Sequence, residues 1–372
     1  MKKVKLGEVA TFINGYAFKP QDWSTEGKEI IRIQNLTKTS KEINYYSGKI
    51  DKKYIVETGD ILISWSGTLG VFQWYGKTAV LNQHIFKAVF DKLDINKSYF
   101  KYVVEKGLQD AVKNTHGSTM KHLTKKYFDN IIVSYTSLKE QQKISRKLDL
   151  LSKLISMRQE QLEELNLLVK SRFNEMFGGN KQFESIDNLF DIIDGDRGKN
   201  YPKSDELFDE EYCLFLNTKN VTKNGFSFFT NQFITETKDK LLRKGKLERY
   251  DIVLTTRGTV GNVAYYDESI KYKHLRINSG MVILRPKKPN LNQKFIIHVL
   301  RNNNYSRVIS GSAQPQLPIT KLKKILLPLP PLSLQNEFAD FVVQVDKSQL
   351  AIQKSLEELE TLKKSLMQEY FG

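Results

Sequence analysis

The side chains that could carry out catalysis in this chain are few and scattered. Asp22, Glu26 and Lys28 are the residue types of a metal-dependent nuclease, but the two carboxylates lie only four residues apart in an expected loop beside Pro20. A solvated loop is the favoured interpretation. The sequence contains no G-x-G-x-x-G after a strand, no P-loop, no H-E-x-x-H and no cysteine cluster. It therefore predicts no catalytic residues and no metal site.

Two short motifs could bind a phosphate group through backbone N–H groups. Gly67-Thr-x-Gly70 and Gly258-Thr-x-Gly261 each follow a run of apolar residues that predicts a strand. A tight turn between two strands gives the same pattern, and it is the favoured interpretation.

Side chains that read nucleic acid are more abundant. Bases are read by Arg, Lys, Asn, Gln, Ser and Thr on loops, and phosphates are held by basic side chains and N–H groups. In the first half of the chain the candidates are Arg32, Gln34, Asn35, Ser64, Ser66, Thr68, Asn82, Gln83, Ser118 and Lys121. In the second half they are Asn217, Lys219, Asn220, Thr255, Arg257, Thr259, Asn278, Ser279, Gln314 and Gln316. Ordinary turn and strand-end positions have the same residue types.

The net charge of +16 is distributed unevenly over the 372 residues. Residues 1–136 and 180–330 have net charges of +8 and +9, whereas 137–179 and 331–372 have +2 and −3. A polyanion bound at two places would need this distribution, although a generally basic, soluble surface would look similar.

The composition, with 40% hydrophobic and 11% aromatic residues, predicts two or more folded domains. The single cysteine, Cys213, excludes a disulfide framework and indicates a reducing compartment. No apolar run approaches the roughly 18 residues of a membrane span, and no signal peptide is recognisable. We expect a cytoplasmic protein.

The elements that would position these loops include a long helix whose sequence pattern occurs twice in the chain. Residues Leu138 to Phe177 carry apolar residues at steps of three and four, interrupted by Arg158 and Arg172, which predicts a coiled-coil helix of about 60 Å. The same pattern recurs 194 residues later without a gap. The predicted seam comprises Ile144, Leu148, Leu151, Ile155, Leu162, Leu165, Val169 and Met176, and Val342, Val345, Ile352, Leu356, Leu359 and Leu366.

The segments before the helices are also duplicated. Residues 6–15 match 186–195, residues 59–70 match 250–261, and the expected strand 131–133 matches 325–327. The offsets are 180, 191 and 194, so the segments before the helices have diverged by insertion and deletion while the helices have not. Residues 30–35 and 214–220 are predicted as strands ending in amides, and 98–112 and 292–305 as short helices.

The predicted architecture is α+β: a β-rich mixed domain and a long helix, both in tandem. The expected boundaries are 1–136, 137–179, 180–330 and 331–372. Two antiparallel helices of equal length would form a coiled coil and relate the copies by a pseudo-two-fold axis.

The order of these motifs resembles the specificity subunit of type I restriction-modification systems. The residues concerned are L-G-E-V at 6–9, G-D-I-L-x-S-x-x-G-T-x-G at 59–70, a Gly-Ser loop near each domain's end, S-L-K-E-Q-Q at 137–142 and L-P-P-L-S-L-Q at 329–335. The family's usual prolines are missing before the first long helix.

This resemblance implies two target recognition domains, each reading one half of a bipartite double-stranded DNA site, joined by spacer helices. It implies no catalysis and no cofactor on this chain. Two modification subunits that bind S-adenosylmethionine and methylate adenine would dock on it, and a restriction subunit using ATP and Mg²⁺ could join.

Two other functions remain open. One is an assembly or adaptor protein whose basic domains bind nucleic acid nonspecifically, and competition binding between duplexes distinguishes it. The other is an enzyme with a diverged nuclease site at Asp22 and Glu26, which would cleave DNA as an isolated chain with a metal.

Overall fold

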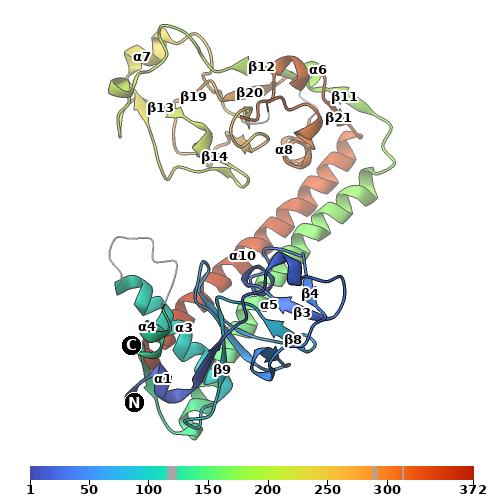
Figure 1. Ribbon diagram of the computed structural model, residues 1–372. Helices are drawn as coiled ribbons and strands as arrows, with labels where there is room; N and C mark the ends of the chain where they lie inside the picture. The colour runs from blue at the N-terminus through green and yellow to red at the C-terminus, as the bar shows by residue number, and fades with distance from the viewer. Residues whose placement is uncertain (115–123, 288–290, 312–313) are drawn as a thin grey trace. The chain divides into compact units, whose positions relative to one another are not determined.

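A computed structural model describes residues 1–114, 124–287, 291–311 and 314–372 (Figure 1). The chain divides into two compact units. Unit 1 comprises Met1–Leu162 and Ala351–Gly372, and unit 2 comprises Glu163–Leu350. Each unit thus contains one β-rich domain, a part of the first long helix and a part of the second. The predicted Ser118 and Lys121 lie outside the described residues.

Unit 1 is built on two four-stranded sheets. The antiparallel sheet has the order β2 (Thr11–Asn14), β9 (Ile85–Val89), β6 (Ile61–Ser64) and β7 (Gly70–Gln73). The mixed sheet has the order β4 (Asn44–Tyr46), β3 (Lys28–Ile31), β8 (Ala79–Leu81) and β5 (Ile55–Val56), with β3 parallel to β8. Strand β6 is buried along its whole length, because apolar side chains cover both of its faces.

Helices and a short strand pair complete unit 1. The pair is β1 (Lys2–Lys5) with β10 (Ile132–Tyr135). The helices of this domain are α1 (Leu6–Val9), α2 (Ile33–Leu36), α3 (Lys97–Asn114) and α4 (Lys125–Asp129). One core joins α3 to the antiparallel sheet and to both long helices, through Phe100, Ile144 and Met367 among others.

Unit 2 repeats this plan. Its antiparallel sheet has the order β12 (Phe190–Asp194), β20 (Met281–Pro286), β17 (Ile252–Thr255) and β18 (Val263–Tyr265). Its mixed sheet is β16 (Phe233–Ile234), β13 (Cys213–Leu216) and β19 (Leu275–Ile277), with β13 parallel to β19. The counterparts of β1, β10, α1, α3 and α4 are β11 (Phe183–Ser185), β21 (Leu326–Pro328), α6 (Ile186–Leu189), α8 (Gln293–Asn302) and α9 (Ile319–Leu322).

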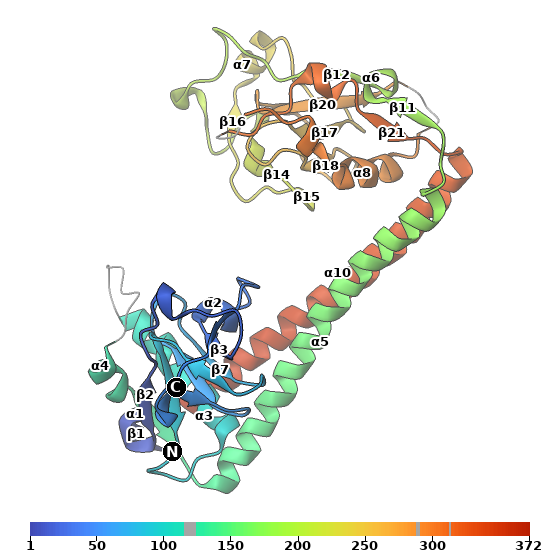
Figure 2. The same cartoon turned by 45° about the vertical axis from the view of Figure 1, so that its right-hand side comes forward.

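Among the described residues, unit 2 also has elements without a counterpart in unit 1. They are a hairpin of β14 (Val221–Thr222) and β15 (Gly225–Phe226), and the helix α7 (Glu236–Leu241) (Figure 2). The two loop residues of the hairpin are Lys223 and Asn224, and Gly225, the first residue of β15, has φ of 115°, which glycine adopts without strain.

The predicted long helices are present as α5 (Leu138–Phe177) and α10 (Leu332–Phe371). Within unit 2 they run antiparallel, since Arg172 bonds Glu337 at 2.8 Å while the earlier residue Asn166 bonds the later residue Gln349 at 3.0 Å. Within unit 1 the last turn of α10 lies beside the third turn of α5, where Lys147 donates to the Tyr370 hydroxyl at 3.3 Å.

The burial of α5 and α10 follows the predicted seam. Ile144, Leu148 and Leu151 are buried, and the other seam residues are buried or partly buried. Apart from the partly buried Leu154, the leucines of α5 and α10 outside the seam are exposed, including Leu167 at 65% and Leu350 at 72%. Among the described residues, no helix is long and apolar enough to cross a membrane.

Two strand predictions are wrong in their second halves. Strands β3 and β13 end at Ile31 and Leu216, and the residues after them form α2 and a 3-10 turn, Thr218–Asn220. The cause is local. The side chains of Asn35 and Asn220 accept the backbone N–H groups of Arg32 and Asn217, which closes a helical turn in each copy.

Candidate nucleic-acid interface

The Gly-Thr turn is built the same way in both units. Ser64 and Thr255, the last residues of β6 and β17, are fully buried and donate their hydroxyl groups to the carbonyl oxygens of Thr68 and Thr259. Gly67 and Gly258 both have φ of 68°, a left-handed conformation that glycine adopts without strain. The favoured interpretation as a tight turn agrees with this geometry, and the turn exposes Thr68 and Thr259.

A second pair of loops is closed by asparagine amides. Asn220 is 1% exposed, and its amide nitrogen donates to the carbonyl oxygens of Ser227 and Thr230 at 3.0 and 2.8 Å. In unit 1 the Asn35 amide donates to the carbonyl oxygen of Glu42 at 2.8 Å. Each asparagine therefore fixes the loop that follows it, seven to ten residues along the chain.

The third repeated feature is a close backbone crossing. A Cβ atom on Gly15 would lie 1.9 Å from the carbonyl oxygen of Asn82, and one on Gly195 would lie 2.1 Å from that of Asn278. Only glycine fits these positions, which explains why both copies end this segment in glycine. The side-chain oxygen of Asn278 accepts the N–H of Gly280 at 2.9 Å. That of Asn82 is buried without a hydrogen-bond partner among the described residues.

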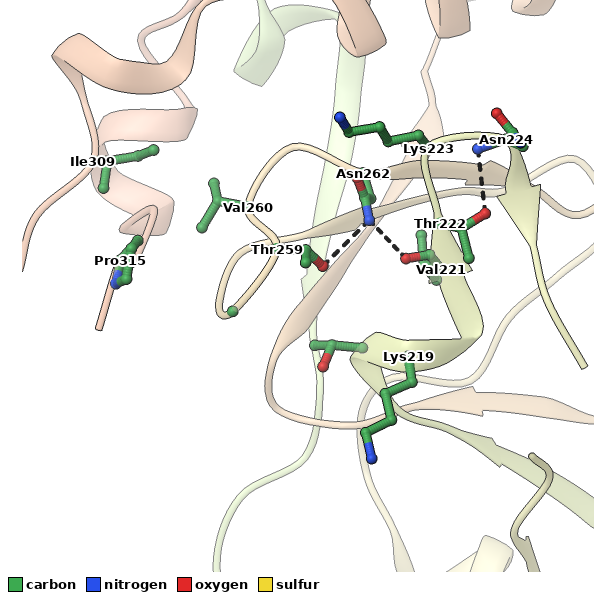
Figure 3. Close-up of a pocket in the computed structure, with 12 residues that line it drawn as sticks. Lys219, Val221, Thr222, Lys223, Asn224, Thr259, Val260, Asn262, Ile309 and Pro315 are labelled. Atoms are coloured by element: carbon green, nitrogen blue, oxygen red, sulfur yellow. Dashed lines mark hydrogen bonds between the residues drawn. The ribbon is translucent and has the colours of Figure 1, made fainter. Parts of the chain in front are cut away.

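In unit 2 these loops border a groove of about 730 Å³ (Figure 3). One wall is the segment 218–224 with the β14–β15 hairpin, and the other is the turn 258–262 with Ile309 and Pro315. Asn262 joins the two walls, because its amide donates to the carbonyl oxygen of Val221 at 2.9 Å and to the Thr259 hydroxyl at 3.2 Å (Figure 3). The groove is therefore framed by fixed backbone.

The charge of the groove's surroundings suits a polyanion. The 68 residues from Ser269 to Asn336 contain no aspartate or glutamate, and neither do residues 212–235. Exposed Lys219 and Lys223 lie on the groove wall. Arg257 precedes the turn, and its guanidinium has no hydrogen bond or ion pair with the described residues. In unit 1, residues 61–90, which include the Gly-Thr turn and Asn82, are likewise free of acidic residues.

Other charges of unit 2 are used internally. Asp239 is 1% exposed and pairs with Arg276 at 2.7 Å and with Lys246. Burial raises the pKa of the Asp239 carboxyl, but the hydrogen bonds from Lys246 and Arg276 outweigh burial, and the pKa is lowered. This pair fixes α7 to strand β19 and leaves Arg276 unable to contact a ligand.

The predicted DNA-binding residues fall into three groups. Thr68, Gln34, Lys219, Thr259, Gln314 and Gln316 are exposed. Arg32, Asn35, Asn82, Gln83, Asn217, Arg257, Asn278 and Ser279 are partly buried at strand ends and turns. Ser64, Ser66, Asn220 and Thr255 are buried. Burial gives this last group a structural role and removes its side chains from the surface that DNA could contact.

Arg32 and Asn35 also have internal partners. The Arg32 guanidinium donates to the carbonyl oxygen of Glu42 at 3.2 Å and lies 5.7 Å from the Trp23 ring centre. By contrast, Lys219 and Thr259 meet at one groove, which brings together residues 40 apart in sequence.

Five polar residues on the groove were missed from the sequence: Thr218, Thr222, Lys223, Asn224 and Asn262. The Asn-Gly pair at 224–225 was a usable signal, because it marks a hairpin turn that places Lys223 at a tip. Asn262 carried no signal of its own, since its role depends on a contact with Val221.

Asp22, one of the two carboxylates considered for a nuclease, has a structural role. The side chain of Asp22 accepts the backbone N–H of Lys19 at 2.7 Å and closes a 3-10 turn, Pro20–Asp22. Within the described residues, no group of three or more His, Cys, Asp or Glu side chains is placed to hold a metal ion.

The Gly-Thr turns of both units lie in stretches without acidic residues, which is the charge pattern of a nucleic-acid-binding surface. Comparison with known families is more specific. The chain matches the family described as type I restriction modification DNA specificity domain twice, over residues 1–167 and 180–362, and it belongs to that family.

Individual relatives are similar over most of their length. The chain is 22% identical to the specificity subunit of the type I restriction enzyme EcoBI from Escherichia coli, over 99% of this chain and 85% of that one. It is 24% identical to the MjaVIII specificity subunit from Methanocaldococcus jannaschii, over 85% and 79%.

Solved structures share the fold. The S subunit of a type I restriction-modification system from M. genitalium superposes with a TM-score of 0.57 at 16% identity, over 100% of this chain and 96% of that one. A chain from a study of complex assembly and conformational transition of the type I system superposes with a TM-score of 0.60 at 15% identity, over 99% of this chain and 97% of that one.

Proposed function

We propose that this chain is the DNA-reading subunit of a type I restriction-modification complex, in which each β-rich domain reads one half of a bipartite target. The repeated framework carries the proposal. Both units keep the four-stranded antiparallel sheet, the Gly-Thr turn and the backbone crossing, while the residues just before the turn differ: Trp65 and Ser66 stand where unit 2 has Thr256 and Arg257. Two readers on one framework would recognise two different sequences.

The contacts with DNA divide by chemistry. Lys219 and Lys223 are suited to phosphates, which set affinity and register, whereas Arg257, Gln314 and Gln316 are suited to base edges. In unit 1 the corresponding readers are Thr68, Asn82 and Gln83. Burial excludes Ser64 and Thr255 from this set and makes them part of the frame.

The remaining roles belong to the long helices and to partner subunits. The helices α5 and α10 set the number of base pairs between the half-sites and provide the docking surface for two modification subunits. The modification subunits supply adenine methylation with S-adenosylmethionine, and a restriction subunit, where present, uses ATP and Mg²⁺. This chain contributes recognition and no catalytic step, and the complex acts in the cytoplasm.

The decisive experiment maps methylated adenines across the genome of cells that carry this chain with its modification subunit. A control strain lacks only this chain. The expected result is one motif of two short specific parts separated by a constant unspecific spacer. The assembled complex should then prefer that duplex over bulk DNA by about 10³-fold or more. Equal binding to all duplexes and no motif would instead identify an adaptor with nonspecific affinity.

A further inference from the structure

One aromatic side chain in unit 2 is entirely exposed. Phe229 is 100% exposed, in the segment between β15 and β16. A single exposed apolar residue is ordinary on a protein surface. What distinguishes Phe229 is that the chain on both sides of it is held firmly, so that its exposure does not result from a loose loop.

The backbone around Phe229 is tied to the groove. Asn220 donates its amide to the carbonyl oxygens of Ser227 and Thr230, on either side of Phe229, and its own carbonyl accepts the N–H of Ser227 at 2.8 Å. Asn220 belongs to the same 3-10 turn as Lys219 on the groove wall. The position of Phe229 is therefore fixed relative to the candidate DNA contacts.

The neighbouring side chains point inward. The ring of Phe228 packs on Tyr272 with 5.0 Å between ring centres, and Asn231 donates to the Tyr272 hydroxyl at 3.2 Å. Because Phe228, one residue before it, and Asn231, two residues after it, are anchored on Tyr272, Phe229 cannot turn into the core without breaking both contacts.

The charge around this tip favours DNA over a protein surface as its partner. Lys271, which lies 5.1 Å from the Tyr272 ring centre, and Lys273 flank Tyr272, and both are exposed. Residues 212–235, which include the tip, and residues 269–277, which include Tyr272 and strand β19, contain no acidic residue. An apolar group surrounded by lysines can enter a base stack while the lysines neutralise the adjoining phosphates.

We propose that Phe229 is a wedge that inserts between two neighbouring base pairs of the half-site read by unit 2. This inference rests on the proposed function and adds a recognition device to it. Insertion costs least at flexible pyrimidine–purine steps, so the wedge selects such a step without hydrogen bonding to it. Unit 1 has no aromatic residue in the loop 36–43 that Asn35 closes, so this device belongs to one half-site only.

The test uses the complete complex with its modification subunits and the duplex found by methylation mapping. 2-Aminopurine replaces one adenine at a time in the half-site assigned to unit 2, and its fluorescence reports unstacking. The variants are Phe229→Ala, which removes the wedge, and Phe229→Leu, which keeps a smaller one. Tyr75→Ala removes an aromatic residue that is 73% exposed in unit 1 and serves as the matched control.

The wild-type complex should raise the fluorescence at a single step. Phe229→Ala should abolish that rise and weaken binding by about ten- to a hundredfold, the usual effect of losing one base-stacking aromatic, while Phe229→Leu should retain part of both. Tyr75→Ala should leave the signal of this half-site unchanged.

Three results would overturn the wedge. If Phe229→Ala changes neither the fluorescence nor the affinity and the complex keeps its sequence preference, the wedge is overturned and the proposed function is not. Failure of Phe229→Ala and Phe229→Leu to retain the modification subunits, although both fold, would identify a protein contact instead. A wild-type complex without a preferred duplex would overturn the proposed function and the wedge together.

Discussion

The side-chain carbonyl of Gln141 accepts the backbone N–H of Asn96 at 2.8 Å, and this bond joins the start of α5 to the N-terminal end of α3. The Gln141 amide also donates to the carbonyl oxygen of Thr136 at 2.7 Å. Unit 2 repeats both bonds: Gln335 accepts from Asn292 at 3.1 Å and donates to Pro330 at 2.8 Å. One buried glutamine in each unit thus locks a long helix onto its recognition domain.

Replacing Gln141 should destabilise unit 1. Gln141→Ala leaves the partly buried N–H of Asn96 and carbonyl oxygen of Thr136 without partners, which costs up to about 1–3 kcal/mol for each group. Chemical denaturation measures the loss. Gln142→Ala, at the exposed neighbouring position, is the matched control and should change stability by less than about 0.5 kcal/mol. Equal effects of the two changes would contradict the lock.

Base-reading residues should act on one half-site each. Arg257→Ala should relax specificity in the half-site of unit 2 and cost about 1–3 kcal/mol of binding, the usual value of a bidentate base contact. Asn82→Ala should affect only the other half-site. Competition binding with duplexes altered in one half at a time measures both. Arg146→Ala, exposed on α5, is the control, and loss of both half-sites together would argue against independent readers.

Breaking the buried ion pair should unfold part of unit 2. Asp239→Asn leaves Arg276 buried without its counter-charge, which costs about 3–5 kcal/mol. The pKa of Asp239 is lowered in the folded state, so its contribution is present above the unfolded pKa and is lost as the pH falls through the folded one. Denaturation curves of wild type and variant should therefore differ strongly at pH 7 and converge in acid. A constant difference at all pH values would contradict the assignment.

His298 should make unit 2 sensitive to mild acid. Burial, with a smaller contribution from Arg301, lowers the pKa of His298 to about 4, and its ring packs 4.9 Å from that of Phe338 on α10. The unfolded chain binds the proton at about pH 6.5, so stability is lost as the pH falls from 6.5 to 4, by up to about 3 kcal/mol. His298→Phe should flatten this pH dependence in thermal unfolding. His274→Phe is the control and should keep the pH dependence, because His274 does not pack against aromatic residues of α10.

Helix length should set the spacing of the half-sites. One heptad inserted into α5 alone leaves α10 unchanged and destroys the equal length of the two helices, so that binding to the original target or assembly with modification subunits should fail. Gel-shift series with duplexes of varied spacer length measure the preferred distance. Unchanged binding to the original spacing would contradict the ruler role.

The sequence by itself determined the repeating plan of the protein. The helices α5 and α10 follow from an apolar period that any local reading detects, and the Gly-Thr turn follows from glycines at two fixed positions. Duplication added confirmation, because a feature found twice in the same order along the chain is a feature of the fold. These signals are local, so they can be recognised without knowing how the rest of the chain folds.

Only the tertiary structure decided which polar side chains are available to DNA. Lys219 and Asn220 are adjacent and equally suited to nucleic acid by type, yet one is exposed and the other buried. The difference arises because Ser227 and Thr230 surround the Asn220 amide, and because Asn262 joins Val221 from 41 residues away. Burial depends on such distant contacts, and no local pattern in the sequence reports them.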